Sequence, residues 1–331
     1  MTRTLLISDL HIGRAESMVS SAERRVTSVV LQEAPLERLL SVLDGYDRLV
    51  LLGDTLELRA SPAHVSRALD AAAPVLRAIG ARLGREREVV IVAGNHDRAL
   101  VEGWTRGRRD ELTPATAVPL DATPLLACIA SLLAPAHVRT SYPGVWLSER
   151  IWATHGHYLD PHLLPVGAYG VARRAVRRRQ FEPASIGDYE RATGPRAGGT
   201  GHALRRPFLA LAQPLLAPLT ATLLDRQMRS QALPALAHVL RRLHLDADWV
   251  LFGHVHRLGP LRGEDPAAWA APGGSPRLVN SGSWMYEPLL VGRAAPPHPY
   301  WPGGAITLQD GGEPCAICLL EELSASQLRE V

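Results

Sequence analysis

The sequence predicts an α/β core that finishes in antiparallel strands. Three observations predict it: short runs of Val, Ile and Leu recur between Gly, Asp, Asn and His residues, stretches with helical spacing separate the first three runs, and the last part of the chain changes to hairpin-like pieces. A length of 331 residues with 46% hydrophobic positions supplies one large core or two smaller ones. This composition excludes a disordered tail, a collagen-like fibre and a disulfide-held miniprotein.

Five buried strands are predicted, because five apolar runs are short, rich in branched residues and bounded by turn residues. They cover residues 4–7, 48–52, 88–92, 150–154 and 248–252. Between the first three runs, helices are predicted over Ala22–Leu43 and Pro62–Leu83, with Ser61 as the N-cap of the second. The C-terminal runs 276–280 and 305–309 are predicted to be antiparallel, with a turn at 310–312 before a run over 315–320.

The composition also bears on the compartment. Three cysteines are too few for a disulfide framework, which indicates a reducing environment. The first residues lack the long apolar segment of a signal peptide, and no window approaches eighteen apolar residues in a row. We therefore expect a cytoplasmic protein, and peripheral contact with an anionic membrane is left open.

Residues 158–248 break the strand rhythm and are predicted to form a helical, basic insertion between core segments 1–157 and 249–331. The insertion has thirteen Arg against seven acidic residues, a balance of +6, whereas the rest of the chain has a balance of −3. Arginine offers a planar fork that suits phosphate or carboxylate. Two interpretations stay open: a lid or cap that faces an anionic partner, and a solvated helical face.

Side chains that can bind metals follow each of the five core strands. They lie in Ser8-Asp9-Leu10-His11, Gly53-Asp54, Gly94-Asn95-His96-Asp97, His155-Gly156-His157 and Gly253-His254-Val255-His256. Ligand sites in α/β sheets lie outside the carboxyl ends of strands, so we expect these side chains to gather. Imidazoles and carboxylates without thiolates indicate Mn, Fe or Zn. One carboxylate can bridge two cations, and a two-metal centre clamps the attacking and leaving oxygens of a displacement at phosphorus.

At these motifs the sequence resembles the calcineurin-like metallophosphoesterase family, whose blocks run D-x-H, G-D, G-N-H-D/E, H and G-H-x-H in this order. The resemblance implies a four-layer αββα sandwich, in which helices cover two facing mixed β-sheets. It also implies hydrolysis of a phosphoester or pyrophosphate bond by in-line attack of a metal-bound hydroxide at a dinuclear centre. Of the candidate metals, Mn is expected to support activity best.

Carried over by position, the resemblance implies a role for each residue. Asp9, His11 and His256 would hold one ion, and Asn95, His155 and His254 the other, with Asp54 bridging. His96 matches the non-ligand histidine of the family, which protonates the leaving oxygen or stabilises the transition state. A facing carboxylate would help it retain its proton, and Asp97 and Glu57 are the candidates. His157 is the alternative to His155 as ligand, or a substrate contact.

The substrate is left open by the five blocks. The insertion lies where bacterial UDP-2,3-diacylglucosamine pyrophosphohydrolases carry a helical lid, and Gly53 to Glu57 is similar to their G-D-x-x-E; His96 departs from the Arg usual in those enzymes. We expect a phosphorylated small-molecule or lipid-linked substrate, with Arg174, Arg177 and Arg178 as candidate contacts. A nuclease or phosphodiesterase acting on nucleic acid is the first alternative, which the scattered aromatic residues of the insertion disfavour. A catalytically silent scaffold is the second, which the complete ligand set disfavours.

Overall fold

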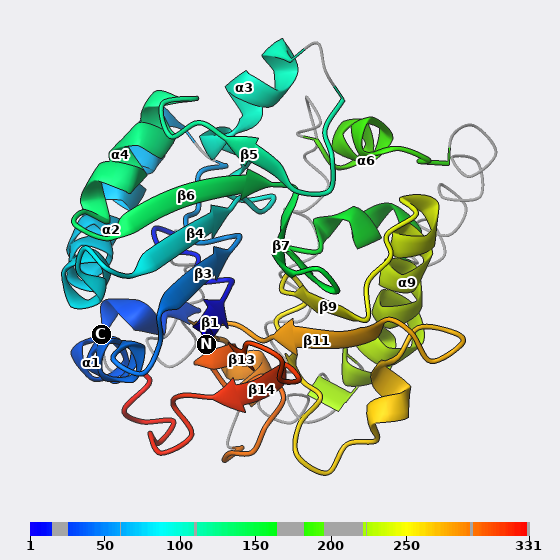
Figure 1. The fold of residues 1–331 in the computed structure, drawn as a ribbon. Coiled ribbons are helices and arrows are strands. Elements are labelled where there is room, and N and C mark those ends of the chain that lie inside the picture. The colour runs from blue at the N-terminus through cyan, green and yellow to red at the C-terminus, as the bar shows by residue number, and fades with distance from the viewer. Residues whose placement is uncertain are drawn as a thin grey trace.

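In the computed structural model, two mixed β-sheets face one another and helices cover their outer faces (Figure 1). The structure describes residues 1–14, 26–59, 61–108, 111–163, 182–194, 221–222, 224–291 and 294–329. Within these ranges no helix is both long enough and apolar enough to span a bilayer.

The first sheet has the strand order β14-β13-β1-β3-β4-β6-β5. Its central strands β1, β3, β4 and β6 are parallel, and β13, β14 and β5 pair antiparallel. The bounds are β1 Arg3–Ile7, β3 Arg48–Leu52, β4 Glu88–Val92, β5 Thr116–Val118, β6 His137–Tyr142, β13 Gly304–Gln309 and β14 Cys315–Cys318. The predicted antiparallel hairpin near the C-terminus is confirmed by β13 and β14.

The second sheet has the order β10-β11-β9-β8-β7, with β11, β9 and β8 parallel. The bounds are β7 Gly144–Ser148, β8 Ile151–Thr154, β9 Trp249–Phe252, β10 Leu258–Gly259 and β11 Arg277–Ser281. The prediction that residues 276–280 pair antiparallel is confirmed for β11 with β10 and is wrong for β11 with β9, which are parallel. The connection between these strands contains β10 and the 3₁₀ helix η7 (Pro266–Trp269), and is long enough for the crossover that parallel pairing requires.

Alternation along the strands divides the core into layers. Leu6, Val50 and Val90 of the first sheet pack between the sheets against Ala153 and Leu251 of the second. Their neighbours along the first sheet point to the other face, where they pack under α1 (Glu33–Leu43), α2 (Pro62–Leu83) and α4 (Pro124–Leu132). Because successive side chains of a strand alternate, each buried strand contributes to two layers. These packing clusters confirm the predicted four-layer sandwich.

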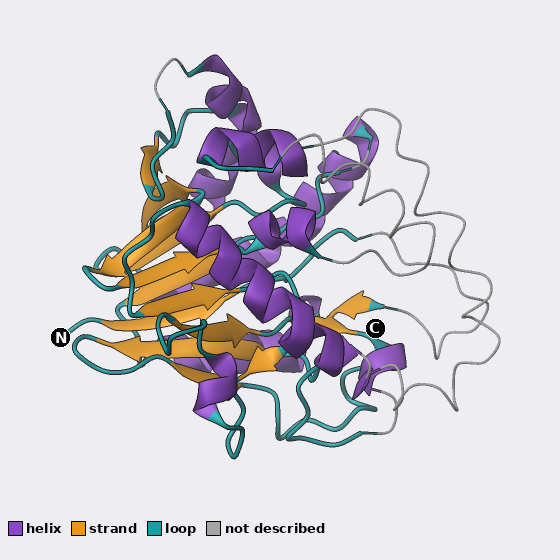
Figure 2. Cartoon of the chain, turned by 90° about the vertical axis from the view of Figure 1, so that its right-hand side faces the viewer, coloured by secondary structure: helices purple, strands orange, loops and turns teal. Residues whose placement is uncertain are grey.

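The outer layer of the second sheet comes from residues that the sequence analysis assigns to the insertion. Helix α9 (Leu233–Arg242) continues a π-helical segment, Met228–Ala232, and packs Leu236 and Leu240 against Val250 and Phe252. Seen from this side, the helices lie in front of the strands (Figure 2). By its packing, α9 is thus a part of the sandwich. The other described insertion elements are η4 (His157–His162) and α6 (Ile186–Thr193).

Helix boundaries agree with the sequence in one case and differ in another. Helix α2 spans Pro62–Leu83 as predicted, with Ser61 at the N-cap; its cap uses the Ser61 carbonyl, which accepts from the next turn, rather than the hydroxyl. The predicted helix over Ala22–Leu43 begins only at Glu33. Residues Thr27–Ser28 form β2, which pairs with β12 (Met285–Tyr286), and Val29–Leu31 form a 3₁₀ turn. The β-branched residues before Glu33 favour this extended backbone.

The remaining short helices are η3 (Arg98–Leu100), α3 (Glu102–Gly107) and α10 (Pro288–Val291). Leu100 of η3 and Val291 of α10 belong to the same core cluster as α1, α2 and α4.

Candidate metal centre

The predicted ligands meet at the carboxyl ends of strands from both sheets. Loops after β1, β3 and β4 of the first sheet bring Asp9, Asp54 and Asn95, and loops after β8 and β9 of the second bring His155 and His254. Contact across the sheets is direct, since Asp54 Oδ2 lies 3.2 Å from His155 Nε2. Only a sandwich with both sheets docked can produce this arrangement.

The loop backbone is left-handed at most of these positions. Asp9, His11, Asp54, His254 and His256 all have φ between 46° and 71°. Among the described residues only one other non-glycine residue, at position 244, has positive φ. This conformation is unfavourable for residues with a Cβ, and such outliers cluster at functional sites. Asp9 and His11, two residues apart, belong to one candidate ligand group, whereas His254 and His256 belong to different groups.

Three glycines of the motifs allow the close approach. A Cβ at Gly94 would lie 2.3 Å from Asp54 Oδ1, and one at Gly53 would lie 2.5 Å from His155 Nδ1. A Cβ at Gly253 would lie 2.6 Å from Asp9 Oδ2. These distances are too short for any Cβ, so the glycines are required for the carboxylates and imidazoles to reach one another.

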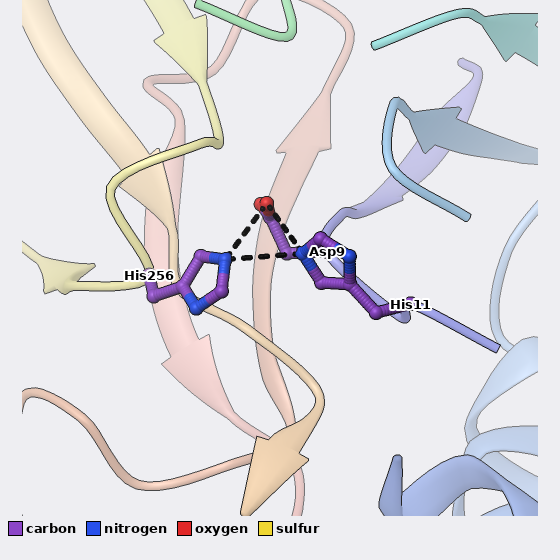
Figure 3. A group of neighbouring side chains, drawn as sticks. All are labelled: Asp9, His11 and His256. Carbon is purple, nitrogen blue, oxygen red and sulfur yellow. Dashed lines mark hydrogen bonds and ion pairs between the residues drawn. The ribbon is translucent and has the colours of Figure 1, made fainter. Parts of the chain in front are cut away.

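The first ligand group consists of Asp9, His11 and His256 (Figure 3). Asp9 Oδ1 lies 3.2 Å from His256 Nε2 and 3.8 Å from His11 Nε2, and the two imidazole nitrogens are 3.2 Å apart. Asp9 Oδ2 points away from this group and accepts the backbone N–H of His254 at 2.9 Å. The carboxylate therefore fixes a loop of the second sheet with one oxygen and faces the imidazoles with the other.

The second ligand group consists of Asp54, His155 and His254, joined by Asn95. The end of the Asn95 amide that faces this group lies 3.1 Å from His155 Nε2, 3.2 Å from Asp54 Oδ2 and 3.3 Å from His254 Nδ1. Asp54 Oδ2 is also 3.8 Å from His11 Nε2, in the first group. Asp54 is thus placed between the two groups, as a bridging ligand must be.

The chemistry of these atoms fits divalent cations. Asp9 Oδ1 is buried and accepts no hydrogen bond from the described residues. The side-chain oxygen of Asn95 faces only hydrogen-bond acceptors, while its nitrogen faces the Arg59 guanidinium. Oxygen and imidazole nitrogen atoms that converge in this way suit a bound cation, and the mixture of carboxylate, amide and imidazole suits Mn, Fe or Zn.

Comparison with protein families matches residues 2–258 to the calcineurin-like phosphoesterases. The match covers most of the chain and includes all five motifs. The chain belongs to the calcineurin-like phosphoesterase family. It is accordingly a phosphoesterase of a family that depends on a dinuclear metal centre, and the fold brings groups of candidate metal ligands together.

Three solved structures are similar to this chain at low sequence identity. The protein of unknown function AQ665 from Aquifex aeolicus is 16% identical, with coverage of 85% of this chain and 89% of that chain and a TM-score of 0.30. A dimetal phosphatase from Danio rerio is 14% identical, with coverage of 96% and 99% and a TM-score of 0.40. A putative 5'-nucleotidase from Staphylococcus aureus, in complex with alpha-ketoglutarate, is 11% identical, with coverage of 96% and 52% and a TM-score of 0.30. No curated protein matches this phosphoesterase in sequence.

His96 of this phosphoesterase lies beside the bridging position and pairs with Glu57. Its Nδ1 is 2.6 Å from Glu57 Oε2, and its Nε2 is 3.8 Å from Asp54 Oδ2. The His96 side chain keeps 23% of its exposure, so it borders the accessible side of the centre. Burial opposes ionisation of Glu57, but hydrogen bonds with His11 and His96 outweigh it and hold the pKa of Glu57 below its ordinary value.

Asp97, the other candidate carboxylate, does not face His96. Its carboxylate is buried and accepts the backbone N–H groups of Gly94 at 2.6 Å and Thr55 at 2.8 Å. Burial, and then the charge of Asp54, raise the pKa of Asp97 to about 6. Asp97 therefore ties the loop after β3 to the loop after β4, and Glu57 alone of the two candidates contacts His96.

The fourth motif is resolved in favour of His155 by geometry. His155 Nε2 faces Asp54, whereas His157 is 1% exposed and neither of its ring nitrogens has a hydrogen-bond partner among the described residues. Burial lowers the pKa of His157 well below its ordinary value, so it stays neutral. A side chain this buried does not line an accessible substrate surface. The other proposed substrate contacts, Arg174, Arg177 and Arg178, lie outside the described residues.

Partners on the far side of each imidazole were missed by the sequence analysis. His254 Nε2 lies 2.7 Å from Asp160 Oδ1, His256 Nδ1 lies 3.4 Å from Glu287 Oε1, and His155 Nδ1 lies 3.1 Å from the Leu52 carbonyl. Such partners fix the tautomer and orientation of a metal-binding histidine. Asn95 also has such a partner, Arg59, whose Nε donates to the main-chain carbonyl of Asn95 at 2.8 Å. No local motif marks these residues, because their partners are distant in sequence.

Carboxylates and imidazoles stabilise one another's charged forms. Burial favours neutral Asp9 and Asp54, but the charges of His256 and His155 outweigh it and hold both pKa values below the ordinary range. Conversely, burial lowers the pKa of His155 and His256, but Asp54 raises that of His155 to about 9 and Asp9 raises that of His256 to about 10. The metal-free centre therefore holds protons where cations would bind.

Proposed function

We propose that this phosphoesterase hydrolyses a phosphoester or pyrophosphate bond by in-line displacement at a dinuclear centre formed by its two ligand groups. The observation that carries the proposal is the place of Asp54, whose Oδ2 is 3.2 Å from His155 of one group and 3.8 Å from His11 of the other. When bound there, a pair of divalent ions supplies Lewis-acid polarisation of phosphoryl oxygens and stabilises charge in the transition state.

His96 is the proposed acid for the leaving oxygen. Its Nδ1 lies 2.6 Å from Glu57 Oε2, so Glu57 orients the ring, and Nε2 is left free to face the leaving oxygen. The 3.8 Å distance from His96 Nε2 to Asp54 Oδ2 supports this role, because it puts the ring next to the proposed bridging carboxylate. His96 would protonate the leaving oxygen or stabilise the charge that develops on it.

The proposed substrate is amphiphilic or nucleotide-linked, with a phosphorylated small molecule as the broader class. The +6 balance of the insertion and its arginine cluster support an anionic ligand or an anionic membrane surface. η4 extends this segment directly from the fourth metal motif, and α6 contacts η4, so the insertion begins at the centre itself. We also propose that the protein is cytoplasmic and that Mn activates it.

A substrate screen tests the reaction and the substrate class together. Purified protein with added Mn would be assayed against phosphomonoesters, cyclic nucleotides, nucleoside diphosphate conjugates and single-stranded DNA. We expect the highest kcat/KM for a pyrophosphate conjugate. Cleavage of DNA with a steep dependence on salt would instead identify a nuclease that uses the basic insertion. Two bound ions without turnover of any substrate would favour a scaffold.

The contribution of the insertion is tested by the triple change Arg174→Ala, Arg177→Ala and Arg178→Ala. We expect the kcat/KM ratio between an amphiphilic pyrophosphate and a small nitrophenyl phosphodiester to fall, because only the larger substrate reaches the arginines. The matched control replaces three exposed arginines on or next to α2, on the far side of the first sheet: Arg67, Arg77 and Arg85. An unchanged ratio, or an equal fall in the control, would show that the arginines are merely solvated.

A further inference from the structure

The two histidines of the last motif are held from outside by different segments of the chain. His254 contacts Asp160, in η4 at the start of the insertion, and His256 faces Glu287, just before α10. The contact of His254 is the shorter one, at 2.7 Å against 3.4 Å. Because His254 Nε2 is paired with Asp160, its other ring nitrogen, Nδ1, faces Asn95 and the second ligand group.

Asp160 is held in place by the packing of η4. Leu159 is fully buried under α9 and the second sheet, and the Tyr158 hydroxyl donates to Glu190 of α6. Glu190 in turn binds Arg98, which directly follows the third metal motif, through an ion pair of 2.7 Å. Asp160 thus sits on a short helix that is fixed both to the sandwich and to the described part of the insertion.

A second ion pair links the insertion to the last motif. Arg257 follows His256 directly, is buried, and donates from Nε to Asp225 Oδ1 at 2.7 Å. Asp225 lies in the described part of the insertion before α9. The loop that carries His254 and His256 is therefore held from the insertion at both ends, by Asp160 and by Asp225.

We propose that Asp160 is a positioning residue for the second metal ion, through which the insertion controls how well that ion is bound. A carboxylate behind a metal-binding imidazole fixes the ring and its tautomer, and its loss commonly weakens metal binding by about 10–100-fold. Glu287 has the corresponding place for the first ion. The inference rests on the proposed ligand role of His254.

Orientation is expected to matter more than charge. The Asp160 side chain keeps 44% of its exposure while that of His254 keeps 15%, so solvent screens the Asp160 carboxylate. Asp160→Asn retains an oxygen that can accept from Nε2–H, and should cost little metal affinity. Asp160→Ala frees the ring and should cost the full effect. This order separates a positioning role from simple attraction between Asp160 and the cation.

The experiment measures Mn²⁺ binding to the full-length chain by calorimetry. To assign the ions, Asp160→Ala is combined with His11→Ala, which removes a ligand of the first ion, and with His155→Ala, which removes one of the second. We expect about 10–100-fold weaker binding in the His11→Ala background and no change in the His155→Ala background. Glu287→Ala should show the opposite pattern. Asp246→Ala, an exposed partner of Arg150 in the same segment, is the matched control.

Thermal unfolding of the metal-free variants distinguishes a role of Asp160 in metal binding from a role in the stability of η4 alone. If Asp160→Ala lowers the metal-free Tm and leaves both Mn²⁺ affinities at the wild-type values, Asp160 only stabilises η4 and the proposal is overturned. An equal loss of affinity for both ions also overturns the proposal. A wild-type protein that binds fewer than two ions would contradict the proposed dinuclear centre itself, which is a different outcome from two ions that ignore Asp160.

Discussion

The two sheets contribute different chemistry to the same centre. The first sheet supplies both carboxylates, the amide of Asn95 and one imidazole ligand, whereas the second supplies imidazoles alone. The carboxylates carry charge of their own, but the imidazoles of the second sheet depend on outer partners such as Asp160 and Glu287 for their orientation. From this difference we infer that the first sheet would supply most of the charge that attracts the cations, whereas the orientation of the second sheet's imidazoles would determine how tightly they bind.

The strongest test of this division is Asp54→Ala. Asp54 is the proposed ligand of both ions and belongs to the first sheet, so its loss removes the negative charge between two cations. We expect metal content below two ions per chain and a larger loss of activity than for any other single variant. Elemental analysis with an activity assay measures this. Asp54→Ala protein that retains two ions would contradict the bridging role.

The next largest effect is expected at His96, which belongs to the first sheet without being a ligand. His96→Ala should lose about 10²–10⁴-fold in kcat while it keeps its metals, because general acid catalysis contributes that much. The loss should shrink for a nitrophenol leaving group, which needs less protonation. Glu57→Gln, which leaves the His96 ring without a charged partner, should show a smaller loss in the same direction. An equal loss in kcat for substrates with poor and with good leaving groups would count against the role of His96 as a general acid.

Removal of metal tests whether bound ions stabilise the docking of the two sheets. Ligands of each ion come from both sheets, so ions bound to the folded chain alone should stabilise the docked sandwich. At 100 times the dissociation constant, one such ion contributes about 2.7 kcal/mol. We expect chelation to lower Tm by several degrees and added Mn to restore it. A Tm that does not respond to metal would show that the sheets stay docked without the ions.

The smallest expected effect is on pH dependence, and it should come from the second sheet. Below pKa values of about 9 for His155 and about 10 for His256, a cation must displace their protons. Apparent Mn affinity should therefore rise from pH 7 to about 9 and level off above these values. The lowered pKa values of Asp9 and Asp54 keep the carboxylates ionised throughout, so they add no slope. An affinity independent of pH from 7 to 9 would contradict this.

The sequence could predict what is local. Strands β3 and β4 and helix α2 have the predicted bounds, because apolar runs and an N-terminal Ser-Pro pair mark them directly. The candidate ligands were found because each follows a strand, and the order of the motifs is that of the family. The start of α1 was missed, because the β-branched run before Glu33 pairs with Met285–Tyr286, a partner nearly 260 positions away.

The parts that the sequence could not predict depend on contacts between distant segments. Asp160 and Glu287 are two acidic residues among 33, and nothing near them in sequence indicates a histidine partner. Helix α9 was assigned to the insertion because it follows a basic, irregular stretch, although its apolar face belongs to the second sheet. The choice between Glu57 and Asp97 likewise required the geometry of two loops.

The left-handed backbone of the ligand loops has a consequence for how this protein can change. Holding a residue with a Cβ in that conformation costs about 1–2 kcal/mol, and Asp9, His11, Asp54, His254 and His256 all adopt it. Glycine would relieve the strain at any of the five positions, so metal-free His11→Gly should be at least as stable as the metal-free wild-type chain, although it no longer binds the full set of ions. Selection for stability of the metal-free chain would therefore remove the ligands of this centre one at a time, and a screen for heat resistance in the presence of a chelator would tend to recover inactive proteins.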